Sequence, residues 1–167
     1  EKGVEGWVFT LQAPSYSPFM TYASNRDLRC KLYMAYNTKC THDNETNNLE
    51  IVKKLVNTRL AIAQLLGYSS FAEYNLQERM AENSGNVYKL LDQLLDAYTP
   101  TAKQEYAEVE ALARQLEGSD FTVMPWDWSY YSHKLKDQKF QIDDEMLRPY
   151  FELSKVKEGV FGLAARW

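Results

Sequence analysis

The chain has 167 residues, of which 45% are hydrophobic and 25% are charged, and its formal net charge is −4. A mean hydropathy of −0.52 and the lack of any apolar run near the ~18 residues that a membrane span needs exclude a transmembrane helix. No basic tract stands out, so we expect neither nucleic acid nor a membrane as a partner. This length fits one domain or a large piece of a longer protein.

The N-terminal stretch is the one part of the chain with a strand pattern. Residues 7–12 alternate between apolar and other side chains, which predicts a β-strand. A lone strand leaves its ladder groups unpaired, so we expect its partner to lie outside this chain. Residues 13–18 predict a turn, and residues 19–23 predict one helical turn.

The rest of the chain predicts an all-α fold. Asn25 or Ser24 caps a helix over residues 26–38, and Asn47 with Glu50 resembles a capping box for a helix that ends before Gly67. Further helices are predicted over residues 70–80, capped by Ser70, over 84–117, capped by Ser84, over 143–148, and from Ser154 onward. Pro100 lies inside the long one, where we expect a kink or a short break. No Gly or Pro stops the last helix, so we expect the chain to be cut from something larger.

Aromatic rings are densest at residues 125–131. Pro125 ends the preceding segment, Asp127 is a plausible N-cap, and Trp128, Tyr131 and Leu135 share one face of the helix that follows. The favoured interpretation is a helix that anchors the core, with Trp128 buried, so that Trp128→Ala would cost about 3–5 kcal/mol. The alternative is one wall of a peptide or nucleotide groove, where amphipathic rings are also common.

Few residues suggest chemistry by themselves. His42 with Asp43 and Glu45 offers metal ligands, but neighbouring residues of one polar loop rarely close a site, so a solvated loop is favoured. His133 has no partner at ligand spacing, which favours a structural or surface role. The acidic residues Asp143, Asp144 and Glu145 suit the first turn of a helix, and Glu105, Glu108 and Glu110 suit an exposed face.

The two cysteines are not expected to bond to each other. A largely helical interval between Cys30 and Cys40 separates them by about 15 Å, whereas a disulfide needs Cα atoms within ~7 Å. The chain contains no His-Glu-x-x-His, no Gly-rich phosphate loop and no Gly-x-Ser-x-Gly. We therefore assign no catalytic and no metal-binding residue, and the substrate-binding residues are unknown.

Short matches in a fixed order run along the whole chain. They occupy residues 6–11, 25–29, 65–68, 71–74, 80–81, 125–127, 130–131 and 147–151. In this order and spacing the chain resembles the zinc oligopeptidase family, which includes thimet oligopeptidase, oligopeptidase A and bacterial peptidyl-dipeptidase. The Trp126-Asp127-Trp128 form looks more like the peptidyl-dipeptidase branch. Glu152 departs from the family pattern, which usually has Pro there.

The resemblance implies a two-lobed, mostly helical parent whose zinc is held by a downstream His-Glu-x-x-His helix and a later Glu. Residues 1–167 would then be a single helical fragment of a metallopeptidase domain, cut before that motif, without zinc or activity of its own. The parent would remove C-terminal dipeptides from short peptides and would lie in the cytoplasm, with the periplasm as the other compartment considered. The alternative is a free-standing helical interaction module without catalysis.

Overall fold

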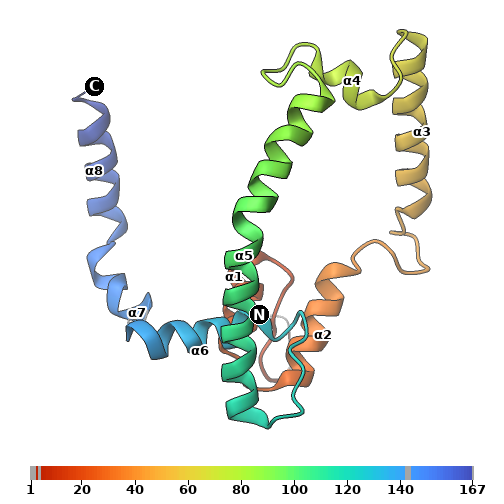
Figure 1. Cartoon of the computed structure of the whole chain (residues 1–167). Helices are drawn as coiled ribbons and strands as arrows, with labels where there is room; N and C mark the ends of the chain where they lie inside the picture. The colour runs from red at the N-terminus through yellow and green to blue at the C-terminus, as the bar shows by residue number, and fades with distance from the viewer. Residues whose placement is uncertain (1–2, 4, 142–143, 167) are drawn as a thin grey trace.

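The computed structural model describes residue 3 and residues 5–141 and 144–166, and this part of the chain is all-α (Figure 1). It contains no β-strand. The helices, in chain order, are α1 (Ala13–Tyr22), α2 (Arg26–Asn37), α3 (Leu49–Leu65), α4 (Phe71–Leu76), α5 (Ser84–Glu117), α6 (Trp128–Phe140), α7 (Asp144–Leu147), the 3-10 turn η1 (Arg148–Tyr150) and α8 (Leu153–Ala164). The predicted fold class is confirmed.

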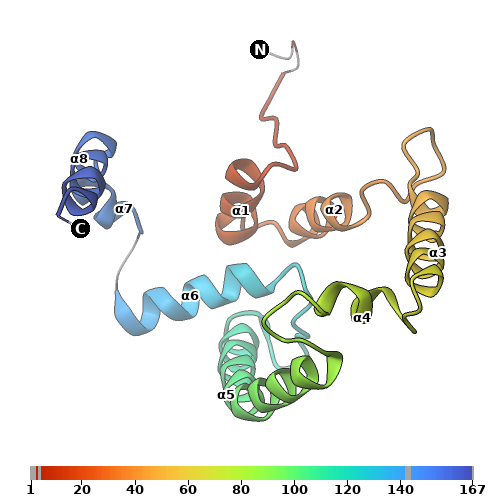
Figure 2. The same cartoon turned by 90° about the horizontal axis from the view of Figure 1, so that it is seen from above.

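The buried core lies where α1, α2, α6 and the second half of α5 meet. Val109 and Ala113 of α5 pack with Val123 and with Tyr131 of α6. Because α5 places residues 109 and 113 one turn apart on the same face, α6 covers one stripe of that helix. Seen from above, α6 runs between α1 and α5 (Figure 2). This base of the molecule positions the candidate site.

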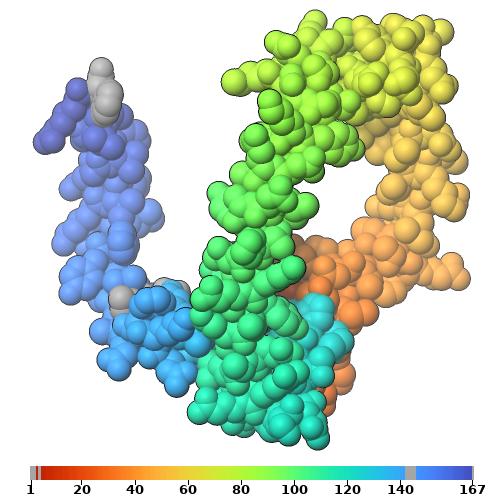
Figure 3. Space-filling view, viewed as in Figure 1, coloured from red at the N-terminus to blue at the C-terminus, as the bar shows by residue number. Residues whose placement is uncertain are grey.

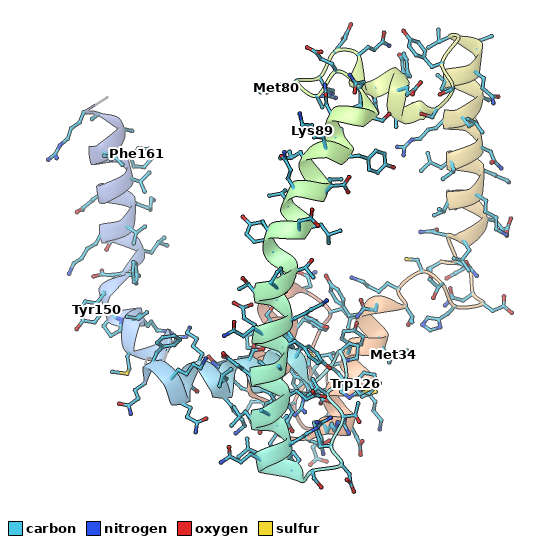
Figure 4. The ribbon with its side chains drawn as sticks, viewed as in Figure 1. Met34, Met80, Lys89, Trp126, Tyr150 and Phe161 are labelled. Atoms are coloured by element: carbon cyan, nitrogen blue, oxygen red, sulfur yellow. The ribbon has the colours of Figure 1, made fainter. Side chains whose placement is uncertain are left out.

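Two arms extend from the base. One consists of α3, α4 and the first half of α5, and the space-filling view shows an opening between α3 and α5 (Figure 3). The other consists of α7, η1 and α8, and Tyr150 and Phe161 lie on it, far from Trp126 in the base (Figure 4). Most apolar side chains of the arms are exposed, including Leu55 and Leu94 on the first arm and Val160 on the second.

The N-terminal stretch differs from the expectation. Residues 7–10 pair with no strand in the described part of the chain, so the expected strand is absent there. The backbone N–H of Thr10 instead donates to Ser15 Oγ at 2.9 Å. The expected turn at residues 13–18 belongs to α1, which starts at Ala13. Pro14 lies in its first turn, where a missing N–H costs no hydrogen bond, although Pro18 lies farther inside.

Several predicted helix ends are confirmed. Asn25 Oδ1 accepts the N–H of Leu28 at 3.0 Å, and Ser70 Oγ accepts that of Glu73 at 3.2 Å. Gly67 ends the α3 segment with a φ of 84°, a left-handed conformation that suits glycine. The cap of α5 is Asn83, not Ser84, because the Asn83 side chain accepts the N–H of Asn86.

Other ends differ by a few residues. α3 begins after Asn48, and the Asn47 side chain accepts the N–H of Leu49. α4 ends at Leu76 rather than near residue 80, and α8 begins one residue before Ser154, whose hydroxyl donates to Glu152. Residue 143, the expected start of the short helix, lies outside the described residues. Helix ends commonly differ by one or two residues, so these shifts leave the architecture unchanged.

No break occurs at Pro100. α5 is one continuous helix of 34 residues, and its ribbon bends near its middle (Figure 1). Proline removes one backbone hydrogen bond and its ring crowds the preceding turn, and a bend relieves that crowding. Of the two expected outcomes, the bend is the one that the structure has.

Candidate functional site

An ion cluster joins α2 to the start of α6, with the Asp127 carboxylate at its centre. Arg26 donates from Nε at 3.0 Å and from Nη2 at 2.7 Å to Asp127 Oδ2. Arg29 donates from Nη2 to Asp127 Oδ1 at 2.8 Å, and the backbone N–H of Met124 donates to Oδ2 at 3.0 Å. Asp127 has the expected N-cap position of α6, but its side chain makes no capping hydrogen bond to that helix because the cluster uses both of its oxygens.

Arg29 is completely buried and its guanidinium is well satisfied. Nη1 donates to the carbonyls of Ala23 at 2.7 Å and Ser24 at 3.1 Å, and Nε donates to the carbonyl of Trp126 at 3.2 Å. The guanidinium carbon also lies 4.2 Å from the centre of the Tyr130 ring. A planar fork with fixed donors suits this arrangement, in which one side chain joins the segment before α2 to the segment before α6.

The cluster keeps Asp127 ionised. Burial by itself raises the pKa of the Asp127 carboxyl, but the hydrogen bonds from Arg26 and Arg29 outweigh that effect and leave the pKa below its ordinary value. At neutral pH the Asp127 carboxylate carries no proton that it could donate, and hydrogen bonds from Arg26, Arg29 and Met124 occupy its two oxygens. The cluster therefore has a structural role.

Tyr131 is buried beside the ion cluster. Its hydroxyl donates to Glu117 Oε1 at 2.9 Å, and the ring packs edge to face on Phe121. Burial, together with the hydrogen bond to Glu117, raises the pKa of the Tyr131 phenol. The phenol thus stays protonated and serves as a hydrogen-bond donor that ties α6 to the end of α5.

Trp128 does not lie in the core. It is 39% exposed, whereas Tyr131 on the same helix is 2% exposed. The indole stacks on the Tyr106 ring with centroids 5.8 Å apart and an angle of 7° between the planes. The expectation of a buried Trp128 is wrong, because α5 and α6 pack through Val109, Ala113 and Tyr131 and leave Trp128 at the rim of their contact.

Two adjoining hollows meet at Trp128. The first, of about 440 Å³, is a groove between α5 and α6 that is lined by Thr101, Gln104, Glu105, Glu108, Val109, Trp128, Ser132, Leu135, Lys136, Lys139 and Phe140. We call it the α5–α6 groove. The second, of about 500 Å³, is apolar and is lined by Ala102, Tyr106, Val123, Met124, Pro125 and Trp128. Glu108 and Lys139 form an ion pair across the groove, and this contact lowers the pKa of the Glu108 carboxyl.

The structure does not bring the sequence-predicted metal candidates together. His42 is exposed, and its Nε2 lies 3.1 Å from Thr38 Oγ1. His133 lies on α6 with Nε2 3.1 Å from Asp137 Oδ2, and its ring packs edge to face on Tyr22. In residues 5–141 and 146–166, no three His, Cys, Asp or Glu side chains are grouped to hold a metal ion.

Both cysteines are free thiols, so the expected lack of a disulfide between Cys30 and Cys40 is confirmed. Glu105 and Glu108 line the α5–α6 groove, while Glu110 pairs with Arg114. Among the helices that the structure describes, none is long and apolar enough to cross a bilayer. Sequence reasoning missed the pairing of Arg26 and Arg29 with Asp127; their spacing of three residues, which puts both on one face of α2, was the available signal.

Comparisons with known proteins give one consistent result. A family model described as "Peptidase family M3" matches residues 19–167. Oligopeptidase A of Escherichia coli strain K12 is 37% identical over 169 residues, which are 99% of this chain and 25% of that protein. Oligopeptidase A of Haemophilus influenzae is 36% identical with the same coverage.

The dipeptidyl carboxypeptidase of Escherichia coli strain K12 is similar at a lower level. It is 30% identical over 166 residues, which are 98% of this chain and 24% of that protein. The chain therefore spans about a quarter of the length of these curated relatives. The Trp126-Asp127-Trp128 form suggested the peptidyl-dipeptidase branch. The higher identity with the oligopeptidase A proteins does not favour that branch.

Proposed function

We propose, from the premise that this chain belongs to peptidase family M3, that it is the helical scaffold of part of a zinc metallopeptidase that hydrolyses short peptides. The observation that carries the proposal is the match of the family model to residues 19–167. The relatives of about four times this length bear the names oligopeptidase and carboxypeptidase, which supports peptides as substrates. Residues 1–167 would form a single helical part of the metallopeptidase domain.

The residues that the structure describes do not fit a catalytic zinc. A catalytic zinc needs about three convergent protein ligands, and the described residues offer no such group. His42 and His133 lie in different parts of the fold with partners of their own. We therefore assign the zinc ligands and the group that activates water to polypeptide outside residues 1–167, and no catalytic step to a residue of this chain.

The class of peptide product is the finer part of the proposal. Cleavage within oligopeptides is favoured, because identity is higher with proteins named oligopeptidase A than with those named dipeptidyl carboxypeptidase. Removal of C-terminal dipeptides is the second candidate, and Trp128 in the Trp126-Asp127-Trp128 form is the residue that favours it. A cytoplasmic location goes with either activity and is compatible with two free thiols.

The experiment is to read the gene beyond the codon for Trp167 and to express the whole reading frame. We expect a His-Glu-x-x-His motif there, and a purified protein that cleaves short peptides, loses activity with a zinc chelator and regains it with added zinc. Mass spectrometry of the products separates internal cleavage from dipeptide release. A reading frame without the motif, whose product cleaves no peptide, would leave the free-standing helical interaction module as the function.

A further inference from the structure

The α5–α6 groove combines apolar surface with charged side chains of both signs. We propose that it binds a short peptide, which places a large apolar side chain against Trp128 and its free α-ammonium group beside Glu105. This inference rests on the proposed function, because it gives the chain a contact with the class of molecule that a peptidase acts on. The groove would be a binding site separate from any zinc site.

The shape of the groove suits a side chain of a peptide. Its volume of about 440 Å³ lies within the range of roughly 300–1,000 Å³ that is common for ligand pockets. Val109, Leu135 and Phe140 supply apolar surface along it, and the Trp128 indole separates it from the apolar hollow near Tyr106. An indole held by stacking on another ring is a rigid platform, which costs little entropy when a ligand packs on it.

The charges of the groove select the rest of the ligand. Residues 101, 104, 105 and 108 of α5 recur three and four positions apart and so form one wall. On this wall Glu108 is paired with Lys139 of the opposite wall, whereas Glu105 forms no ion pair with any residue that the structure describes. An unpaired carboxylate beside an apolar recess complements an ammonium group next to a large side chain, which is the N-terminal end of a peptide.

Other occupants fit less well. Glu105 and Glu108 on one wall offset Lys136 and Lys139 on the other, so the groove lacks the excess of positive charge that binds the phosphates of a nucleic acid. A partner helix would need a continuous apolar stripe, but charged residues of both signs line the two walls here. A second copy of the chain is the other occupant that the experiment below distinguishes, by light scattering.

The test is calorimetric titration of the 167-residue chain with three peptides: Phe-Ala-Ala-Ala, its N-acetylated form and Gly-Ala-Ala-Ala. We expect the Gly peptide to bind about tenfold more weakly or worse, because it lacks the ring that packs on Trp128. Acetylation should weaken binding about three- to fivefold, since the exposed ion pair with Glu105 is lost. Glu105→Gln should remove the effect of acetylation, and Trp128→Ala should remove the advantage of Phe over Gly.

Tyr88→Ala is the matched control, because Tyr88 is an exposed ring of α5 that does not line the groove. It should bind all three peptides as the unchanged chain does. Glu105→Gln alters an exposed helix position and keeps the test valid if Trp128→Ala does not fold. Equal affinities for the three peptides, or no binding by the chain, would overturn the inference, as would light scattering that shows a dimer dissociated by Trp128→Ala. Zinc-dependent cleavage by the product of the whole reading frame would still support the proposed function in each of those cases.

Discussion

At the scale of single residues, the charge on Asp127 fixes how α2 meets α6. The carboxylate accepts hydrogen bonds from two guanidinium groups, and one of these, that of Arg29, is wholly buried. Removing one partner of a buried pair leaves an uncompensated charge, which costs far more than an exposed pair does. We therefore expect substitution of Asp127 to lower the stability of the chain more than substitution of an exposed acidic residue does.

Asp127→Asn is expected to destabilise the chain by about 3–5 kcal/mol, because Arg29 would stay buried without its counter-charge. Chemical denaturation monitored by circular dichroism measures the change. Asp120→Asn is the control, since Asp120 is exposed and Ser119 is its one hydrogen-bond partner among the residues that the structure describes. It should change stability by less than about 0.5 kcal/mol. An equal effect of the two variants would show that the cluster does not stabilise the fold.

Acid should act on the same group. The pKa of Asp127 is lower in the folded chain than its ordinary value near 3.8, so its contribution is complete above that value and is lost as pH falls through the lower folded pKa. Unfolding measured at a series of pH values should show this loss below about pH 4 in the unchanged chain. Asp127→Asn should lack this component of the acid sensitivity, and identical pH profiles would contradict the assignment.

Tyr131 and Trp128 should differ in their effect on stability. Tyr131→Ala removes a buried ring and the hydrogen bond to Glu117, so we expect a loss of about 3–5 kcal/mol. Trp128→Ala removes a half-exposed ring, and its cost should be less than half of that. Thermal melts of both variants provide the comparison. A larger effect at Trp128 would restore the core role that its spacing with Tyr131 and Leu135 suggested.

At the scale of elements, Pro100 is expected to lower the stability of α5, the helix that contains it. α5 continues through it, yet proline lacks the N–H that would bond to the preceding turn. Pro100→Ala should stabilise the chain by about 1–3 kcal/mol, because the helix regains that bond and its crowding is relieved. Pro14→Ala is the control: Pro14 lies in the first turn of α1, where no bond is missing, so its effect should be close to zero. Destabilisation by Pro100→Ala would mean that the bend is needed for packing.

The sequence predicts helices better than it predicts their partners. Caps such as Asn25 and Ser70 act over three residues, so local reasoning finds them. The strand at residues 7–12 failed because a strand exists only with a neighbour, and the described chain provides none. Trp128 failed for a related reason: helical spacing places it beside Tyr131, but only the position of α5 decides which of the two is covered.

The candidate site, too, has features that can be predicted from the sequence and features that depend on how the helices pack. The absence of a zinc motif can be read from the sequence alone, whereas the pairing of Arg26 and Arg29 with Asp127 joins segments about a hundred residues apart. Helical periodicity gives no information about such distances. The α5–α6 groove likewise depends on how two helices cross, which is a property of the packed molecule.

At the scale of the whole molecule, stability should be uneven. The base contains the buried core, while α3 and α8 expose most of their apolar side chains. Local opening is easiest where few apolar contacts oppose it. Hydrogen exchange followed by mass spectrometry should therefore show faster exchange in α3 and α8 than in α6 and the second half of α5. Uniform protection would indicate that the arms are covered, for example by association of the chain with itself.

The ion cluster also constrains when the molecule can form. Its hydrogen bonds join Asp127 to Arg26 and Arg29 across separations of 101 and 98 residues. During synthesis, α2 leaves the ribosome about a hundred residues before Asp127 is made. Arg26 and Arg29 therefore stay solvated while α3, α4 and α5 are synthesised. Closing so long a loop is slow compared with forming a helix. We thus expect the helices of the first arm to form before α2 packs against the start of α6. The contact between these two segments forms only after Asp127 has been synthesised.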